Sequence, residues 1–206
     1  MTQTPTQNAP RAQYADEDWL LINDFLQGKE SAFGGIFEKY KKKVINLAFR
    51  FLKEAQSAED IAQEVFIRIY EKKIRYDPRA KFSTLLYRIT VNASLDSIRK
   101  KKFFPISLDQ KAGEESGDGQ TFLDRLANPK SDSPDGTFEQ DELKMLLRKE
   151  IDQLPEKLRS PLLLYQFEEM PYGDIAQVLG ITTKAVERRI YHAKGQLRKK
   201  LAKYLS

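Results

Sequence analysis

Residues 172–197 read YGDIAQVLGITTKAVERRIYHAKGQL, and this stretch decides the fold of the second half of the chain. Its apolar spacing predicts a short helix over 172–179, a tight turn at Gly180 and a longer second helix. Glycine suits the turn because it adopts a left-handed backbone at little cost. Two helices joined in this way are typical of a helix-turn-helix. The residues expected to face inward are Ile175, Ala176, Leu179, Ile181, Val186, Ile190, Ala193, Leu197 and Leu201.

The second of these helices is expected to be capped by Thr182 or Thr183. Its other face is polar and partly basic, as the major groove of DNA requires of a recognition helix. An ordinary hairpin with a solvated face is the alternative, but a hairpin does not require small, turn and β-branched residues at positions 176, 180 and 186. For His192, a surface histidine without a role stays open. The candidate DNA contacts are Thr183, Lys184, Glu187, Arg188, Arg189, Tyr191 and His192.

The first half of the chain also has helical periodicity. Apolar residues recur every three or four positions over 33–51, and a shorter helix is indicated near Trp19. Ser57 is predicted to cap the next helix, with Asp60 three residues later. After a break at residues 77–78, a long helix is expected from 82 to about 102. No segment shows a convincing period of two, so the fold class predicted is all-α.

Residues 105–137 separate the two helical halves. Gly, Ser, Asp and Pro dominate this stretch, and apolar periodicity disappears. It is predicted to be a flexible acidic linker, because it buries too little apolar surface to offset its ordering entropy. The expected organisation is two small helical domains, the C-terminal one a helix-turn-helix: a disordered tail over 1–15, a first domain over 16–104, the linker over 105–137 and a second domain over 138–206.

Composition excludes several classes of protein. With no cysteine and a single histidine, a disulfide or a protein-built metal site is not expected, and no cofactor is implied. The N-terminus lacks the apolar core of a signal peptide, and no apolar run is long enough to cross a membrane, so we expect a cytoplasmic protein. Residues 32–104 hold 17 Lys and Arg against 8 Asp and Glu, which favours a polyanionic partner such as nucleic acid.

Two polar faces in the first half are candidate binding surfaces. One follows the helix after Ser57, and is either a solvated face or a surface for a partner's charged side chains. The other lies on the long helix from residue 82, where cations and an amide suit unpaired nucleotides, although lysines at a helix end also complement its dipole. The first comprises Asp60, Gln63, Glu64, Ile67 and Arg68; the second comprises Leu85, Arg88, Asn92, Asp96, Arg99, Lys100 and Lys101.

Four motifs together resemble the extracytoplasmic-function (ECF, group IV) sigma factors of the sigma-70 family. They are DIAQEVFIR at 60–68, FSTLLYRITVN at 82–92, LPEKLR at 154–159 and the stretch 172–197. Their order and separation are highly specific, and the resemblance covers about 31–104 and 138–203. It implies a sigma region 2 domain, a sigma region 4 domain and a function in promoter recognition, promoter melting and transcription initiation.

The resemblance also implies partners and roles. The helix at 60–68 would bind the clamp helices of the largest subunit of core RNA polymerase, and the polymerase flap is a further contact. The face from Leu85 to Arg99 would capture and melt the −10 element of promoter DNA, with Asn92 near a flipped base, and the helix at 183–195 would read the −35 element. The resemblance further implies that the free protein is a monomer, that it is not inserted in a membrane, and that an anti-sigma factor holds it inactive.

Some residues depart from the family pattern. Leu85 stands where the family usually has tryptophan, and Lys184-Ala185 replaces a common Gly-Thr. Glu187 replaces a common lysine or arginine, and His192 a common arginine. These differences predict that the chain recognises a promoter sequence different from those of its relatives.

Two alternative functions fit the sequence less well. A stand-alone helix-turn-helix regulator would need a dimer interface or a ligand pocket, and the first half offers neither an obvious seam nor a site. An enzyme is not expected, because Asp60 and Glu64 lie four residues apart without any further group to complete a metal or acid–base site.

Overall fold

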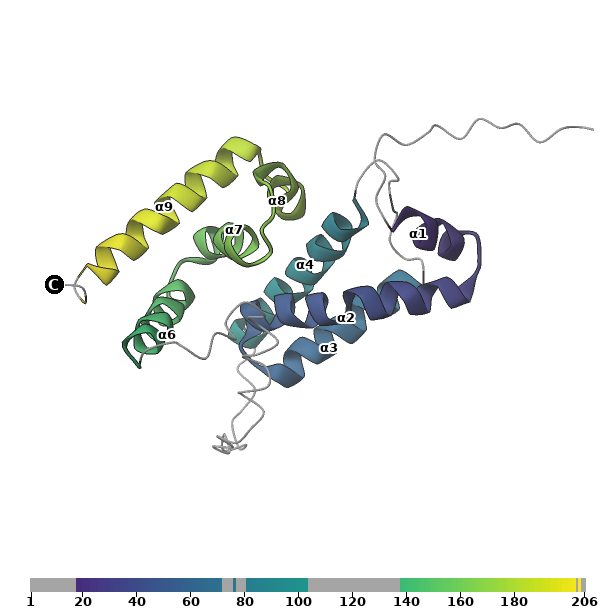
Figure 1. Ribbon diagram of the computed structural model, residues 1–206, viewed down its shortest axis with the longest axis horizontal. Coiled ribbons are helices and arrows are strands. Elements are labelled where there is room, and N and C mark those ends of the chain that lie inside the picture. Colours follow the sequence, from purple (N-terminus) through teal and green to yellow (C-terminus); the bar gives the residue numbers. More distant parts are fainter. Residues whose placement is uncertain (1–17, 72–75, 77–80, 104–137, 203, 205–206) are drawn as a thin grey trace, which may run out of the picture.

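The computed structural model describes residues 18–71, 76, 81–103, 138–202 and 204 (Figure 1). Every regular element in these residues is a helix, which confirms the all-α prediction. A first unit contains α1 (Trp19–Leu26), α2 (Glu30–Leu52), α3 (Ala55–Tyr70) and α4 (Phe82–Phe103), and a second contains α6 (Phe138–Asp152), α7 (Glu156–Phe167), α8 (Tyr172–Leu179) and α9 (Thr183–Leu201). The predicted tail and linker lie outside the described residues.

Helix α2 is the centre of the first unit, and α1, α3 and α4 all pack against it (Figure 1). The predicted apolar stripe faces this packing: Tyr40, Val44, Leu47 and Phe51 are almost inaccessible to solvent, and Phe33 and Phe37 are half-buried. Aromatic side chains fill the space toward the neighbouring helices, for example Phe37 against Phe66 with ring centroids 4.9 Å apart. These contacts fix the relative orientation of α3 and α4, whose outer faces carry the candidate binding residues.

The start of α3 differs from the prediction. The helix begins at Ala55, after Glu54 in an extended conformation, and Ser57 lies inside its first turn. The predicted cap at Ser57 is therefore wrong. The reason is that the Ser57 hydroxyl donates a hydrogen bond to the Glu54 carboxylate at 2.7 Å, and Asp60 accepts one from Gln56 at 3.1 Å, so neither side chain caps the backbone.

The second unit contains the predicted helix-turn-helix, α8 followed by α9. Gly180 has a φ of 64°, and the N–H groups of Gly180 and Ile181 both donate to the Ala176 carbonyl, which ends α8. Of the two candidate caps, Thr182 begins α9: its hydroxyl oxygen accepts a hydrogen bond from the Ala185 N–H at 3.2 Å. Helix α7 packs against both α8 and α9 and closes the core around Ile175 and Val186, which are fully buried.

Apolar residues at helical spacing on α6 are unevenly buried. On α6, Ile151 is buried, whereas Leu143 and Leu147 expose 42% and 37% of their surface. Helix α6 packs against α9 near its C-terminal end, where Lys200 pairs with Glu150. No helix in the described part of the chain has both the length and the hydropathy of a membrane span.

The turn at Gly180 gives a stability prediction with a matched control. Gly180→Ala should lower the free energy of unfolding by about 1–2 kcal/mol, because an added Cβ meets no atom but must adopt a left-handed backbone. Gly195→Ala, on α9 and equally unobstructed, should instead raise it by about 1 kcal/mol through helix propensity. Urea denaturation followed by circular dichroism measures both; equal effects of the two substitutions would contradict the turn assignment.

Candidate functional site

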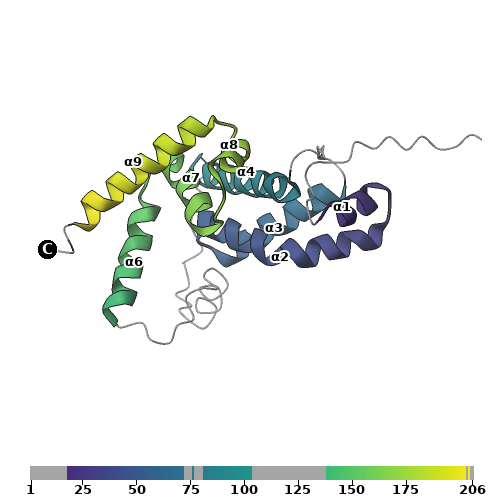
Figure 2. The same ribbon diagram turned by 45° about the horizontal axis from the view of Figure 1, so that its top comes forward.

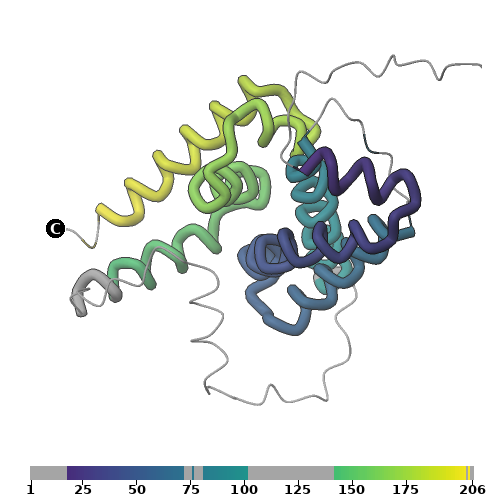
Figure 3. Tube along the Cα trace, turned by 45° about the vertical axis from the view of Figure 1, so that its right-hand side comes forward, coloured from purple at the N-terminus to yellow at the C-terminus, as the bar shows by residue number. Residues whose placement is uncertain are grey.

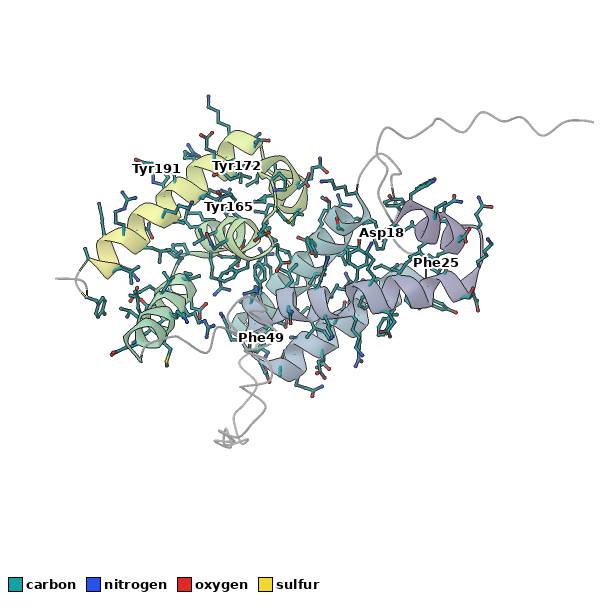
Figure 4. All side chains as sticks on the ribbon, in the orientation of Figure 1. Asp18, Phe25, Phe49, Tyr165, Tyr172 and Tyr191 are labelled. Carbon is teal, nitrogen blue, oxygen red and sulfur yellow. The ribbon has the colours of Figure 1, made fainter. Side chains whose placement is uncertain are left out.

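The predicted recognition helix presents its polar face to solvent. On α9, the side chains of six of the seven candidate residues are exposed: Thr183, Lys184, Glu187, Arg188, Tyr191 and His192. Arg189 is half-buried, at the edge of this face. Tyr191 is 76% exposed, and Figure 4 shows it on the outer side of α9, away from α7. A large aromatic side chain held in solvent beside two cations is available for a partner.

A shallow hollow of about 500 Å³ runs along this face, lined by Thr182, Lys184, Ala185, Glu187, Arg188 and Tyr191. The short side chain of Ala185 leaves the centre of the hollow open, and the longer side chains around it form a rim. A rim of two cations, a carboxylate and a phenol can both approach phosphates and read base edges.

Two tyrosines that the sequence analysis missed lie beside this helix. The rings of Tyr165 on α7 and Tyr172 on α8 are 5.3 Å apart (Figure 4). The Lys194 ammonium lies 4.7 Å from the centre of the Tyr165 ring. Desolvation, followed by Tyr165 and Glu187, raises the pKa of the Tyr172 hydroxyl. The Glu187 carboxylate of α9 thus acts electrostatically on the Tyr172 hydroxyl at the start of α8. Periodicity did not reveal this group because its members come from three helices.

On α4, the predicted polar face is exposed with one exception. Arg88, Asn92, Asp96, Arg99, Lys100 and Lys101 all lie at the surface. Leu85 is only 7% exposed and belongs to the core of the first unit, so in this conformation it has no surface to offer to DNA. Its position in the first turn of α4 places it under the covering helices, which a helical wheel of α4 alone does not show.

Two cations at the far end of this face are already paired. Arg99 donates to Asp96 at 3.3 Å and to Glu156 of α7 at 2.9 Å. Lys101 donates to Glu54 at 2.6 Å and to Ser57 at 3.2 Å. The hydrogen bonds from Lys101 and then Ser57 lower the pKa of Glu54. Arg88 and Asn92, one turn apart, form the middle of the exposed stripe.

The third predicted surface is the outer stripe of α3. Asp60, Gln63, Ile67 and Arg68 are exposed and Glu64 is half-buried. Glu64 and Arg68 form an ion pair one helical turn apart. Ile67 exposes 56% of its surface, and Tyr70, which the sequence analysis did not include, exposes 46%. The stripe therefore combines exposed charges with an exposed apolar side chain.

Within the described residues, no cluster of three or more His, Asp or Glu side chains is arranged to hold a metal ion.

Comparison with known proteins assigns both units. Residues 36–104 match the family model of sigma-70 region 2, and residues 144–197 match that of sigma-70, region 4. The chain is 35% identical over 185 residues to the ECF RNA polymerase sigma factor SigW of Bacillus subtilis, covering 87% of this chain and 94% of that protein. It is 32% identical over 186 residues to the RNA polymerase sigma-H factor of Pseudomonas aeruginosa, covering 90% and 94%.

The fold has a solved counterpart in CnrH, whose structure was determined in complex with the cytosolic domain of CnrY. The TM-score is 0.64 at 22% sequence identity, over 91% of this chain and 98% of that one. At this identity the likeness concerns the fold alone.

The helix-turn-helix and the two matched regions define a DNA-binding sigma factor of the sigma-70 type, which directs transcription initiation. More narrowly, the chain belongs to the ECF RNA polymerase sigma factors. The alternative of a stand-alone regulator is not favoured, because region 2 is matched as well as the helix-turn-helix. The family consists of regulators that recognise DNA and are not enzymes.

Proposed function

We propose that this sigma factor binds core RNA polymerase through the outer stripe of α3 and promoter DNA through α4 and α9. The observation that supports it is that three polar faces, on three helices of the matched regions, all reach solvent in one structure. Region 2 would span 16–104 and region 4 would span 138–206, with 105–137 as the connection. We also place the chain in group IV.

Regulation by a protein inhibitor is part of the proposal. CnrH, which shares the fold, was solved with the cytosolic domain of another protein, CnrY. We propose that an anti-sigma factor likewise binds this chain, that the free chain is a cytoplasmic monomer, and that it does not insert into membranes.

The stripe on α3 is proposed to meet the clamp helices of the polymerase, and a flap contact is assigned to region 4. Ile67 supplies an apolar centre, and Asp60, Glu64 and Arg68 supply charges around it. Charged side chains at the edge of such a patch give specificity and speed of association.

The test is run-off transcription with purified core polymerase, which this chain should support on a cognate promoter. Asp60→Arg should weaken binding to core at least about tenfold, because an exposed charge at an interface is reversed, while stability changes by only about 0.5 kcal/mol. Glu59→Arg, the adjacent exposed carboxylate outside the stripe, is the matched control. Fluorescence anisotropy measures binding; equal effects of the two reversals would return the α3 stripe to a merely solvated face.

The face of α4 is proposed to act on unpaired DNA of the −10 element. Arg88 would hold the backbone, and the Asn92 amide, which both donates and accepts, would read an extruded base. Extruding a base costs a few kcal/mol of stacking, which a pocket must offset.

Loss of the Asn92 amide should affect melting more than initial binding. Asn92→Ala should reduce the rate of open-complex formation about tenfold or more and leave closed-complex affinity nearly unchanged, because the amide meets its base only after strand separation. Permanganate reactivity of unpaired thymines measures melting, and Gln166→Ala, an exposed amide on α7, is the control. Full permanganate reactivity in the Asn92 variant would refute the role of Asn92.

The face of α9 is proposed to read the −35 element. Glu187 is the residue of most interest, because a carboxylate accepts a hydrogen bond from the amino group of cytosine, whereas arginine and lysine favour guanine. Its proximity to Tyr172 leaves a second role, that of orienting neighbouring side chains.

Glu187→Arg tests whether Glu187 reads a base. If Glu187 reads a base, the substitution should change preference at one −35 position by about 1–3 kcal/mol and leave the other positions unchanged. If Glu187 acts only through its charge, the substitution should instead raise the affinity for every DNA sequence and steepen the salt dependence of binding. Selected-site sequencing with both proteins measures this; an unchanged −35 motif would show that Glu187 is not a reader.

A further inference from the structure

Two tyrosines form a supporting group behind the polar face of α9. Tyr165 lies in the last turn of α7 and Tyr172 is the first residue of α8, and both rings pack against the core of the second unit. Their ring centroids are 5.3 Å apart, with a tilt of 55° between the ring planes. Figures 2 and 3 show α8 meeting α9 at the end where α9 begins, which brings this pair beside α9.

The backbone fixes the place of Tyr172. The Met170 N–H donates to the Leu164 carbonyl at 3.2 Å, and the Pro171 carbonyl accepts a hydrogen bond from the Ile175 N–H at 3.0 Å. These two hydrogen bonds hold the turn between α7 and α8 at both ends. The proline ring also restricts the backbone just before Tyr172. The Tyr172 side chain therefore extends from a rigid position.

Two opposite charges of α9 lie at the two ends of this pair. Glu187 and Lys194 are two helical turns apart in the sequence, which places them on the same side of α9 at about 10 Å from each other. The Lys194 ammonium lies 4.7 Å from the centre of the Tyr165 ring, and this attraction helps to hold the ring in place. At the other end, burial, then Tyr165 and then Glu187 raise the pKa of the Tyr172 hydroxyl.

The position of the pair suits an action on Glu187 more than on a ligand. The Tyr172 hydroxyl donates a hydrogen bond to Tyr165, and both side chains are half-buried. The residues that line the hollow on the polar face come from α9 and its cap, and Glu187 is among them. The tyrosines thus stand behind the carboxylate that faces the hollow.

A carboxylate in this hollow is positioned poorly by its own helix. A glutamate side chain has several staggered rotamers, and the Lys184 and Arg188 cations of the same rim attract it in other directions. A fixed hydroxyl on one side favours a single position of the carboxylate. Because an ionised carboxylate has about four acceptor sites, the remaining ones stay available to a base.

We propose that Tyr172, braced by Tyr165 and Lys194, is a positioning residue that holds the Glu187 carboxylate where it accepts a hydrogen bond from a base of the −35 element. The inference rests on the proposed function of the α9 face. It gives the first helix of the helix-turn-helix a part in sequence specificity, through a side chain that acts on Glu187 and not on the DNA.

Tyr172→Phe tests this role because it removes the hydroxyl and keeps the ring. At the −35 position that Glu187 reads, base preference should fall about three- to tenfold, the effect of one lost hydrogen bond, and preferences at the other positions should stay unchanged. Selected-site sequencing with the full-length variant bound to core polymerase measures this. Tyr204→Phe, which removes an exposed hydroxyl beyond the end of α9, is the matched control and should behave as the parent.

A double-variant cycle separates positioning from direct contact. Glu187→Ala should abolish the preference at that position, and adding Tyr172→Phe should change nothing further, because the hydroxyl then has no carboxylate to position. A further change in the double variant would show that Tyr172 contacts DNA itself, and a uniform loss at all positions would show a merely structural role. Either result overturns the inference, as does an unchanged preference in Tyr172→Phe when Glu187→Ala alters it.

Failure of the proposed function gives a different result. If Glu187→Ala leaves every preference unchanged, Glu187 is not a reader, and the positioning role is lost with it. The contact itself is tested in the free full-length protein: Glu187→Gln should lower the pKa of the Tyr172 hydroxyl, because a neutral amide does not disfavour the phenolate. Nuclear magnetic resonance of isotope-labelled tyrosine rings over a pH series measures this pKa, with Tyr172→Phe to assign the signal. An unchanged pKa would overturn the inference.

Discussion

Helix α4 is buried on two sides, and the arrangement of the whole molecule depends on this constraint. One side, with Leu86 and Ile89, packs into the first unit; another, with Tyr87 and Val91, packs into the cluster shared with the second unit. Only a narrow stripe is left for solvent, and Arg88, Asn92 and Asp96 occupy it at intervals of one helical turn.

The same constraint explains what the sequence could and could not predict. The stripe on α4 and the helix-turn-helix both follow from spacing within one helix or across one short turn, so a helical wheel finds them. On a helical wheel of α4, Leu85 falls with the exposed stripe, but in the structure its side chain is buried in the core of the first unit. Likewise, Leu143 and Leu147 of α6 share the apolar spacing of Ile151 but are partly exposed, because α9 covers only part of α6.

The buried ion pair of Arg50 on α2 and Glu168 after α7, which lie 3.5 Å apart, was beyond prediction for a different reason. Arg50 and Glu168 are separated by most of the chain, and each reads in its own segment as an ordinary charge of an amphipathic helix or of a turn. Arg50 is next to Phe51 of the apolar stripe of α2. Glu168 directly precedes Glu169, which has a left-handed φ of 51°. The two side chains are brought together by the packing of the two units, and periodicity within one helix carries no information about that packing.

A buried charged pair contributes little net stability to an interface. An apolar interface of the same area is stabilised by its full burial energy, whereas desolvation of two charges offsets much of what their attraction contributes. The pair instead makes the contact between the two units specific, because a misdocked unit would leave the Glu168 carboxylate buried away from Arg50.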